Sequence, residues 1–135
     1  MICSICRKEI SGHGHNAFPV IIGGQCCDRC NEKIVMPVRL FFATRKKQDY
    51  AMLILKDEIK LFKPKGKYFT LKELQEAVEG YIEVYSSCFP GYLNVVNEEG
   101  NLKNLYFNEL SYKMFDTEFV GNVLVCPVRI FEKPE

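Results

Sequence analysis

Five of the seven cysteines in this sequence lie within its first 30 residues, and four of them form two closely spaced pairs. Cys3 and Cys6 make the first CxxC pair, and Cys27 and Cys30 make the second. Two cysteines three positions apart can bind one metal ion from a single tight turn, so two such pairs supply the four thiolates of a tetrahedral site. The spacing therefore predicts one structural Zn²⁺ held by these four side chains.

Three further residues leave the ligand set open. Cys26 can replace Cys27 as a ligand, and His13 or His15 can replace a cysteine, because both histidines fall between the two pairs. CxxC is the more usual spacing and four thiolates already fill a tetrahedron. We therefore favour Cys27, assign Cys26 to packing, and interpret the two histidines as part of a polar loop.

Catalytic motifs are missing from the sequence. It contains no phosphate-binding P-loop, no GxSxG nucleophile turn and no HExxH zinc-protease motif. Both histidines lie in the cysteine-rich segment, so no Cys–His or Ser–His pair can form outside it. Cys88 is the remaining candidate nucleophile, and its sequence neighbours carry no positive charge. We expect a protein that is not an enzyme.

The composition narrows the class of protein further. Lys and Arg number 18 against 17 Asp and Glu, whereas dedicated nucleic-acid binders usually carry a larger positive excess. The hydrophobic fraction of 47% is in the globular range. No apolar run is long enough to span a membrane, and the first residues do not resemble a secretory signal. We therefore expect a cytoplasmic protein with no membrane partner.

The elements that must position the cysteines follow from local signals. Residues 18–22 are typical of a short strand, and Gly23-Gly24 of a hairpin turn. Asp28 follows Cys27 directly and can cap a helix there, and Pro37 is expected to end or kink this helix. A cysteine pair, a hairpin and a helix that donates the second pair resemble a treble-clef zinc finger, which we place at residues 1–43.

The end of this helix is too apolar for a finger of this size. We expect its large side chains to form an interface with the rest of the chain, because the polar connector at 44–49 is short. A homodimer is the alternative partner for the same surface, and we expect the cores of the two domains to be separate. The predicted interface residues are Val38, Leu40, Phe41 and Phe42.

Residues 50–131 predict an α+β domain with a largely antiparallel sheet and one main helix, in the order β-β-α-β-β-(α)-β. Thr70 and Glu73 form a capping box at the start of that helix, and Gly80 is placed at its C-cap. Asn108 can cap a second, short helix. The main helix is expected at 71–79 and the strands at 51–55, 59–62, 81–85, 92–96 and 122–126.

Three segments of this domain resemble the signature of a small uncharacterised domain found in phages and mobile elements. They are residues 74–84, 96–100 and 121–125, and Leu102, Leu105 and Asn108 fit the same pattern. The resemblance covers about residues 50–130, but this chain adds the cysteine-rich segment in front and has Tyr106-Phe107 where a smaller pair is expected. The resemblance implies a phage or plasmid accessory protein in a bacterial cytoplasm, and it implies no activity.

Amides and phenols border the expected sheet and can hydrogen-bond or stack against a small polar ligand. With the resemblance, they lead us to expect a non-catalytic zinc-containing protein that binds a host protein or traps a small nucleotide-like ligand, in counter-defence. The alternative is a nucleic-acid-binding zinc-finger protein in which basic residues such as Lys63, Lys65 and Lys67 contact phosphates. The ligand-binding candidates are Tyr81, Asn97, Asn104, Tyr106 and Asn108.

Overall fold

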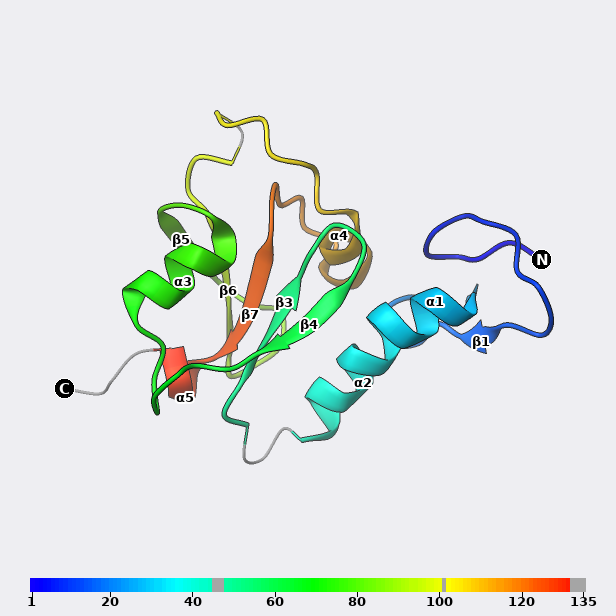
Figure 1. Ribbon diagram of the computed structural model, residues 1–135, viewed down its shortest axis with the longest axis horizontal. Helices are drawn as coiled ribbons and strands as arrows, with labels where there is room; N and C mark the ends of the chain where they lie inside the picture. The colour runs from blue at the N-terminus through cyan, green and yellow to red at the C-terminus, as the bar shows by residue number, and fades with distance from the viewer. Residues whose placement is uncertain (45–47, 101, 132–135) are drawn as a thin grey trace.

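A five-stranded antiparallel sheet forms the centre of the computed structural model, which describes residues 1–44, 48–100 and 102–131 (Figure 1). Two hairpins form its outer parts and β7 lies between them, which confirms the predicted α+β fold class. In sheet order the strands are β4 (Ile59–Phe62), β3 (Ala51–Ile54), β7 (Val123–Pro127), β6 (Tyr92–Asn97) and β5 (Ile82–Ser86).

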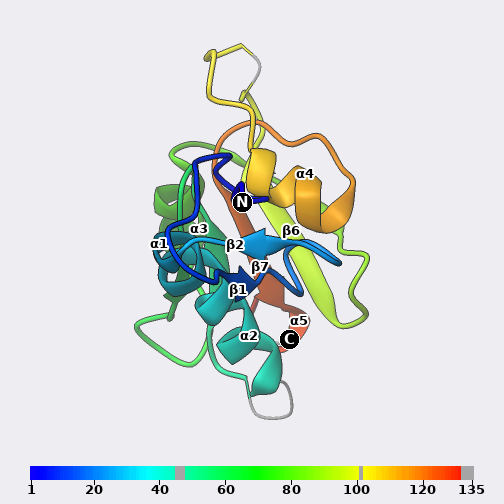
Figure 2. The same ribbon diagram turned by 90° about the vertical axis from the view of Figure 1, so that its right-hand side faces the viewer.

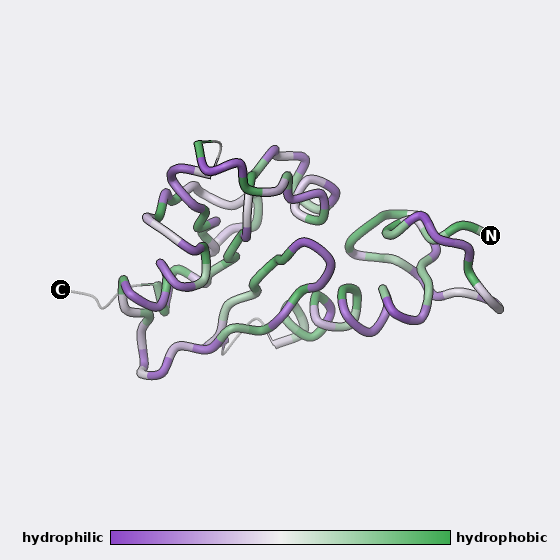
Figure 3. The backbone as a smooth tube through the Cα atoms, turned by 45° about the horizontal axis from the view of Figure 1, so that its top comes forward, coloured by the Kyte–Doolittle hydropathy of each residue, from purple (hydrophilic) through white to green (hydrophobic). Residues whose placement is uncertain are grey.

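The two faces of the sheet are covered by different elements. Side chains alternate along a strand, so Leu53 and Leu124 pack with α3 (Leu71–Val78) and α5 (Val128–Phe131) on one face. Met52 and Val125 belong to the opposite face, with α4 (Glu109–Phe115) and the cysteine-rich segment. Figure 3 shows the hydrophobic residues concentrated along the strands and hydrophilic residues at the turn between β3 and β4.

The cysteine-rich segment consists of a small hairpin and a long helical stretch. Its strands β1 (His15–Asn16) and β2 (Gln25–Cys26) lie in front of the sheet in Figure 2. The predicted strand at 18–22 is wrong, because those residues form turns in which Val20 and Ile21 donate to the Ala17 carbonyl. Pro19 has no N–H group to donate to a neighbouring strand, so a proline at this position favours a turn.

The helix starts where it was predicted, but Asp28 is its first residue and not its cap, because Cys27 takes the N-cap position and no side chain caps the helix. The helix does not end at Pro37. It continues from α1 (Asp28–Cys30) through one π-helical segment, η1 (Asn31–Val35), into α2 (Met36–Ala43). The Met36 N–H donates to the Asn31 carbonyl five residues earlier, so the turn before the proline is widened. A widened turn relieves the clash that a proline ring makes with the carbonyl four residues before it.

The expectation of two separate cores is wrong. Cys30, Ile34 and Phe41 of the cysteine-rich segment pack in the same hydrophobic cluster as Met52 and Val125 of the sheet. The cysteine-rich segment has too few apolar side chains to close a core around itself, and the sheet face needs a cover. The two parts therefore share one core.

The main helix of the sheet region has the predicted start and a different end. The Thr70 side chain accepts from the Glu73 N–H, and Glu73 returns a bond to the Thr70 backbone, which confirms the capping box. Glu79, with φ 63°, takes the left-handed C-cap position that was expected for Gly80. Gly80 is instead a site of close approach, since a Cβ there would lie 2.6 Å from Asn97 Nδ2.

Candidate metal centre and adjacent cleft

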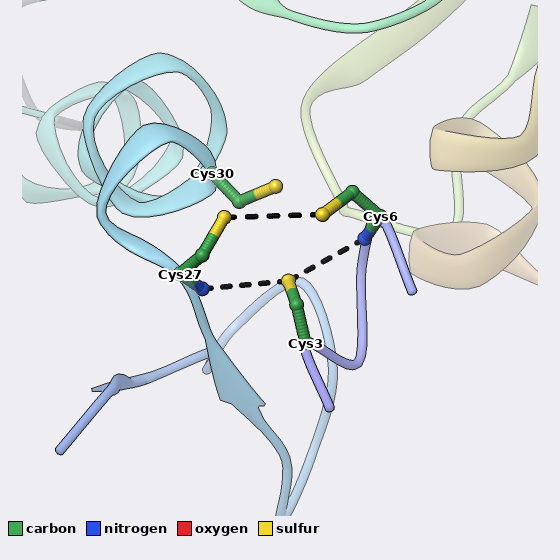
Figure 4. A group of neighbouring side chains, drawn as sticks. All are labelled: Cys3, Cys6, Cys27 and Cys30. Carbon is green, nitrogen blue, oxygen red and sulfur yellow. Dashed lines mark hydrogen bonds between the residues drawn. The ribbon is translucent and has the colours of Figure 1, made fainter. Parts of the chain in front are cut away.

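The sulfur atoms of Cys3, Cys6, Cys27 and Cys30 point toward one another and all lie within 4.8 Å (Figure 4). The first pair comes from the N-terminal loop, and the second from the first turn of α1 and the residue before it. The Sγ atoms of Cys6 and Cys27 are 3.8 Å apart. Four sulfurs placed ~2.3 Å from a central ion form a tetrahedron with edges of about 3.8 Å, so this group could hold a metal ion.

Backbone hydrogen bonds prepare one of these sulfurs to carry charge. Cys3 Sγ accepts from the N–H groups of Cys6 and Cys27, both at 3.4 Å. Burial of the Cys3 thiol would raise its pKa, but the bonds from the backbone of Cys6, Cys27 and Ile5 lower that pKa to about 6. Burial raises the pKa of Cys30, as do its hydrogen bonds with the neighbouring thiols. Four thiolates this close repel one another, and a bound cation removes that penalty.

Two cationic side chains attach the cysteine loops to neighbouring elements. Arg39 of α2 donates from Nε to the Phe18 carbonyl and from Nη2 to the Asn16 carbonyl, both at 2.9 Å. Lys113 of α4 donates from Nζ to the carbonyls of Ser4 and Ile5, at 3.3 and 3.0 Å. The loop between Cys3 and Cys6 is therefore fixed to α4 as well as to its own hairpin.

The structure separates Cys26 and the histidines from the four-sulfur group. Cys26 is fully buried in the shared core, and burial raises the pKa of its thiol. His15 Nε2 lies 2.7 Å from Asp28 Oδ1 at the start of α1, and His13 is exposed. These three residues, which the sequence left open as ligands, are not part of the metal-binding group found among the described residues.

The predicted interface residues contact the sheet to different degrees. Val38 and Phe41 are fully buried, and the Phe41 and Tyr92 rings lie 5.5 Å apart. Phe42 is partly buried against Phe89, with ring centroids 4.9 Å apart. Leu40 is 53% exposed, so it does not belong to this contact within one chain. Its place at an interface between two copies of the chain stays a prediction.

A buried glutamine joins α2 to the sheet, and sequence reasoning missed it. Gln48 Nε2 donates to the Phe41 carbonyl near the end of α2, and Gln48 Oε1 accepts from the Tyr92 hydroxyl at 2.6 Å. The connector at 44–49, which its polar residues would suggest is solvated, is therefore buried at Gln48; residues 45–47 lie outside the described part of the chain. No sequence pattern distinguishes this glutamine from its polar neighbours.

The ligand-binding candidates of the sheet region mostly bond to the chain itself. Asn97 donates to the carbonyls of Val78 and Glu79 at the end of α3. Tyr106 donates to Asn122, a residue that sequence reasoning missed, and Asn122 donates to the Ala77 carbonyl. These side chains satisfy carbonyls that a helix end leaves without partners.

The remaining candidates lie in different settings. Asn108 is buried, caps α4 by accepting from the Ser111 N–H, and donates to the carbonyls of Ile54 and Gly121. Tyr81 and Asn104 are exposed, and Asn104 has φ 53° in a turn. Burial raises the pKa of Tyr106 to about 12. A ligand role for the five residues stays a prediction, and three of them have a structural role.

A cleft of about 630 Å³ lies beside the four-sulfur group, between the cysteine loops, the β3–β4 turn and α4. Cys6, Cys27 and Cys30 form part of its wall. Positively charged side chains outnumber negative ones in the lining. The cations are Arg7, Lys8, Arg29, Lys56 and Lys113, and the carboxylates are Glu9, Asp57 and Glu109.

Within the described residues, no helix has the length and apolar character needed to cross a membrane. No match was found among curated proteins or solved structures. A family model described as a domain of unknown function, DUF3846, matches residues 51–130, which is more than half of the chain. The chain therefore belongs to the DUF3846 family.

Proposed function

We propose that this protein is a non-catalytic binding protein in which a structural Zn²⁺ fixes one wall of a ligand cleft. The ligand of this proposal is a small, anionic, nucleotide-like molecule. The observation that carries it is the cleft of about 630 Å³ beside the four cysteines, which five cationic side chains line against three carboxylates. A concave surface with excess positive charge attracts phosphate groups.

The donor set supports zinc as the ion and a structural role for it. Thiolates are soft ligands that favour zinc over hard cations such as Mg²⁺, and four of them complete a tetrahedron. A closed site has no open position for a substrate or a water molecule. The metal in this proposal orients α1 and the cysteine loops, and the binding is done by the side chains around them.

The cations of the cleft fall into a fixed set and an available set. Arg29 Nη1 donates to the Asp57 carbonyl at 3.1 Å, and Lys113 donates to two carbonyls of the cysteine loop. Arg7, Lys8 and Lys56 are exposed, and in the described part of the chain no ion pair engages them. The available set can turn toward a phosphate without breaking a bond of the fold.

The setting of the proposal rests on the resemblance to phage and mobile-element proteins. In a bacterial cytoplasm, a protein of this kind would blunt a defence by sequestering a nucleotide-like signal or by holding a host protein. The charged cleft favours the small anion over the host protein, because its volume is that of a small-molecule site.

A nucleic-acid-binding role is the second candidate, and the same positively charged cleft is what favours it. The lysines at 63–67 support nucleic-acid binding less than the sequence suggested, because two of them have contacts within the chain. Lys63 Nζ lies 3.4 Å from Asp49, and Lys67 Nζ lies 5.6 Å from the centre of the Tyr68 ring. The net charge of +1 also limits attraction to a polyanion.

Calorimetric titration with a nucleoside triphosphate and with a single-stranded oligonucleotide tests the proposal, beside elemental analysis for one zinc per chain. Lys56→Glu should weaken nucleotide binding at least about tenfold, since it reverses a charge in the cleft. Lys72→Glu, on the opposite face in α3, is the control and should bind normally. Steep loss of oligonucleotide affinity with salt, without nucleotide binding, would favour the second candidate. Binding of neither ligand would overturn both.

A further inference from the structure

A second cavity lies at the other end of the same sheet face, with a volume of about 390 Å³. Strands β5 and β6 form its floor, and the end of α4 with the segment 117–120 forms its wall. It shares no lining residue with the cleft beside the cysteines. The two sites can therefore be tested independently.

The pairing of β5 with β6 decides which side chains reach this cavity. Tyr85 lies opposite Asn94, and Glu83 lies opposite Val96. Residues directly opposite each other in an antiparallel pair share a face, and so do residues two apart in one strand. All four line the cavity, on the face that α4 covers in part.

Asn94 is the unusual residue of the floor. It is only 3% exposed, and its Oδ1 atom is buried with no hydrogen-bond partner among the described residues. A buried carbonyl oxygen without a donor is unfavourable, so native structures rarely keep one unless something else binds there. Because Asn94 lines the cavity, a donor group held in the cavity would supply the missing bond.

The charge of the lining determines what kind of donor fits. Glu83, Glu98 and Glu118 line the cavity, and its lining contains no lysine or arginine. In the described part of the chain, none of these three carboxylates forms an ion pair. An anionic ligand would be repelled here, and a cationic one attracted.

Aromatic rings add a second attraction for a cation. The Tyr85 and Phe119 rings lie 5.7 Å apart, and both residues line the cavity together with Phe115. The Tyr85 hydroxyl donates to Glu83 Oε1 at 2.5 Å, so the ring is held beside the carboxylate. Aromatic faces next to carboxylates are a usual environment for ammonium and guanidinium groups.

We propose that this cavity binds a small organic cation, with an ammonium or guanidinium group donating to Asn94 Oδ1 and lying among Glu83, Glu118 and the Tyr85 and Phe119 rings. The volume suits a molecule of fragment size and excludes a folded partner. This site is opposite in charge to the cleft beside the cysteines, so the same ligand does not fit both.

Titration of the ¹⁵N-labelled full chain, followed by NMR, tests this proposal with three probes. Benzylammonium represents a free amine, N-acetylarginine amide represents the side chain of a peptide, and benzyl alcohol is the neutral counterpart of the first. We expect the side-chain amide of Asn94 and the backbone of residues 117–120 to shift with one or both cations. Benzyl alcohol should bind at least about fivefold more weakly, because it has no charge for the carboxylates.

Variants separate a binding role for Asn94 from a purely structural one. Asn94→Leu should abolish the shifts and raise the melting temperature, since it removes an unpaired buried oxygen at similar volume. Glu83→Gln and Glu118→Gln should each weaken binding about threefold to tenfold and leave the fold intact. Glu76→Gln, exposed in α3, is the matched control and should bind normally.

Several results would overturn the proposal. Equal binding of the neutral alcohol would show an apolar pocket in place of a cation site. An Asn94 amide that no probe perturbs would show that ordered water alone satisfies its oxygen. Two results together would mean that Asn94 has only a structural role. They are a lower melting temperature for Asn94→Leu and unchanged cation binding by Glu83→Gln and Glu118→Gln.

Discussion

The cysteine-rich segment and the sheet region reach their structures by different means. The first has two strands of two residues each; its four cysteine sulfurs lie close together, and the bonds of Arg39 and Lys113 hold its loops. The second has five strands and packs apolar side chains on both of its faces. One of those faces, however, is completed by α2. The sheet region therefore closes one face with its own helices and depends on the cysteine-rich segment for part of the other.

The largest expected effect is that of removing a metal ligand. Cys27→Ser should lower the free energy of unfolding by more than about 3 kcal/mol, because zinc binding in small domains contributes on the order of 10 kcal/mol. Thermal unfolding and zinc content measure the result. Since the core is shared, NMR signals of Met52 and Val125 should also change. Cys26→Ala is the control and should keep one zinc per chain; equal metal loss in both variants would contradict the ligand assignment.

The next effect concerns the aromatic contact that joins the two regions. Phe41→Ala should cost about 3 to 5 kcal/mol in denaturant unfolding, as expected for a large, fully buried ring. Leu40→Ala, at the exposed neighbouring position, should stay within about 1 kcal/mol of the parent. Similar losses at both positions would mean that Leu40 is buried in solution, by a second copy of the chain.

The buried glutamine tests the polar part of the same contact. Gln48→Ala removes the donor to the Phe41 carbonyl and the acceptor for the Tyr92 hydroxyl, and should cost about 1 to 3 kcal/mol. Gln25→Ala, at an exposed position of β2, is the control with little expected change. If Gln48→Ala unfolds at the parent's denaturant concentration, α2 is held by its apolar side chains alone.

The smallest effect lies within the sheet region, away from the four cysteines. Hydrogen bonds from the backbone of Thr70 and Lys65 lower the pKa of Glu73 below its unfolded value. The stabilisation is therefore present above the unfolded pKa and is lost as pH falls through it toward the folded value. Glu73→Gln should lose about 1 kcal/mol or less at neutral pH and show a weaker loss of stability in acid. Glu76→Gln should follow the parent's pH profile.

Local signals in the sequence predicted what depends on neighbouring residues. The capping box at Thr70 and the Asn108 cap each need only a side chain and a nearby backbone N–H. The CxxC spacing works in the same way, since each pair forms one turn. Short apolar runs bounded by turn signals were enough to place the five strands of the sheet within one residue.

Features that depend on distant residues were missed or misplaced. Pro37 was expected to end or kink the helix, and the π-helical segment that carries the chain past it, with Val38 and Phe41 buried against the sheet, was not foreseen. Gly80 was expected at the C-cap. Its lack of a side chain instead leaves room for the Asn97 side chain, which comes from β6. No sequence pattern pointed to the buried Asn94 Oδ1, which has no hydrogen-bond partner among the described residues. Its burial results from the pairing of β5, β6 and β7.

The central position of β7 has a consequence for the order of folding. The hairpins β3–β4 and β5–β6 can each form from adjacent sequence, but both pair with a strand that follows them in the chain. During synthesis, the cysteine pairs and both hairpins leave the ribosome before β7 exists to join them. The proposed metal binding can thus precede completion of the sheet, and α2 can pack on β3 and β4 before that last strand is inserted. Translation must pass residue 127 before the shared core can close.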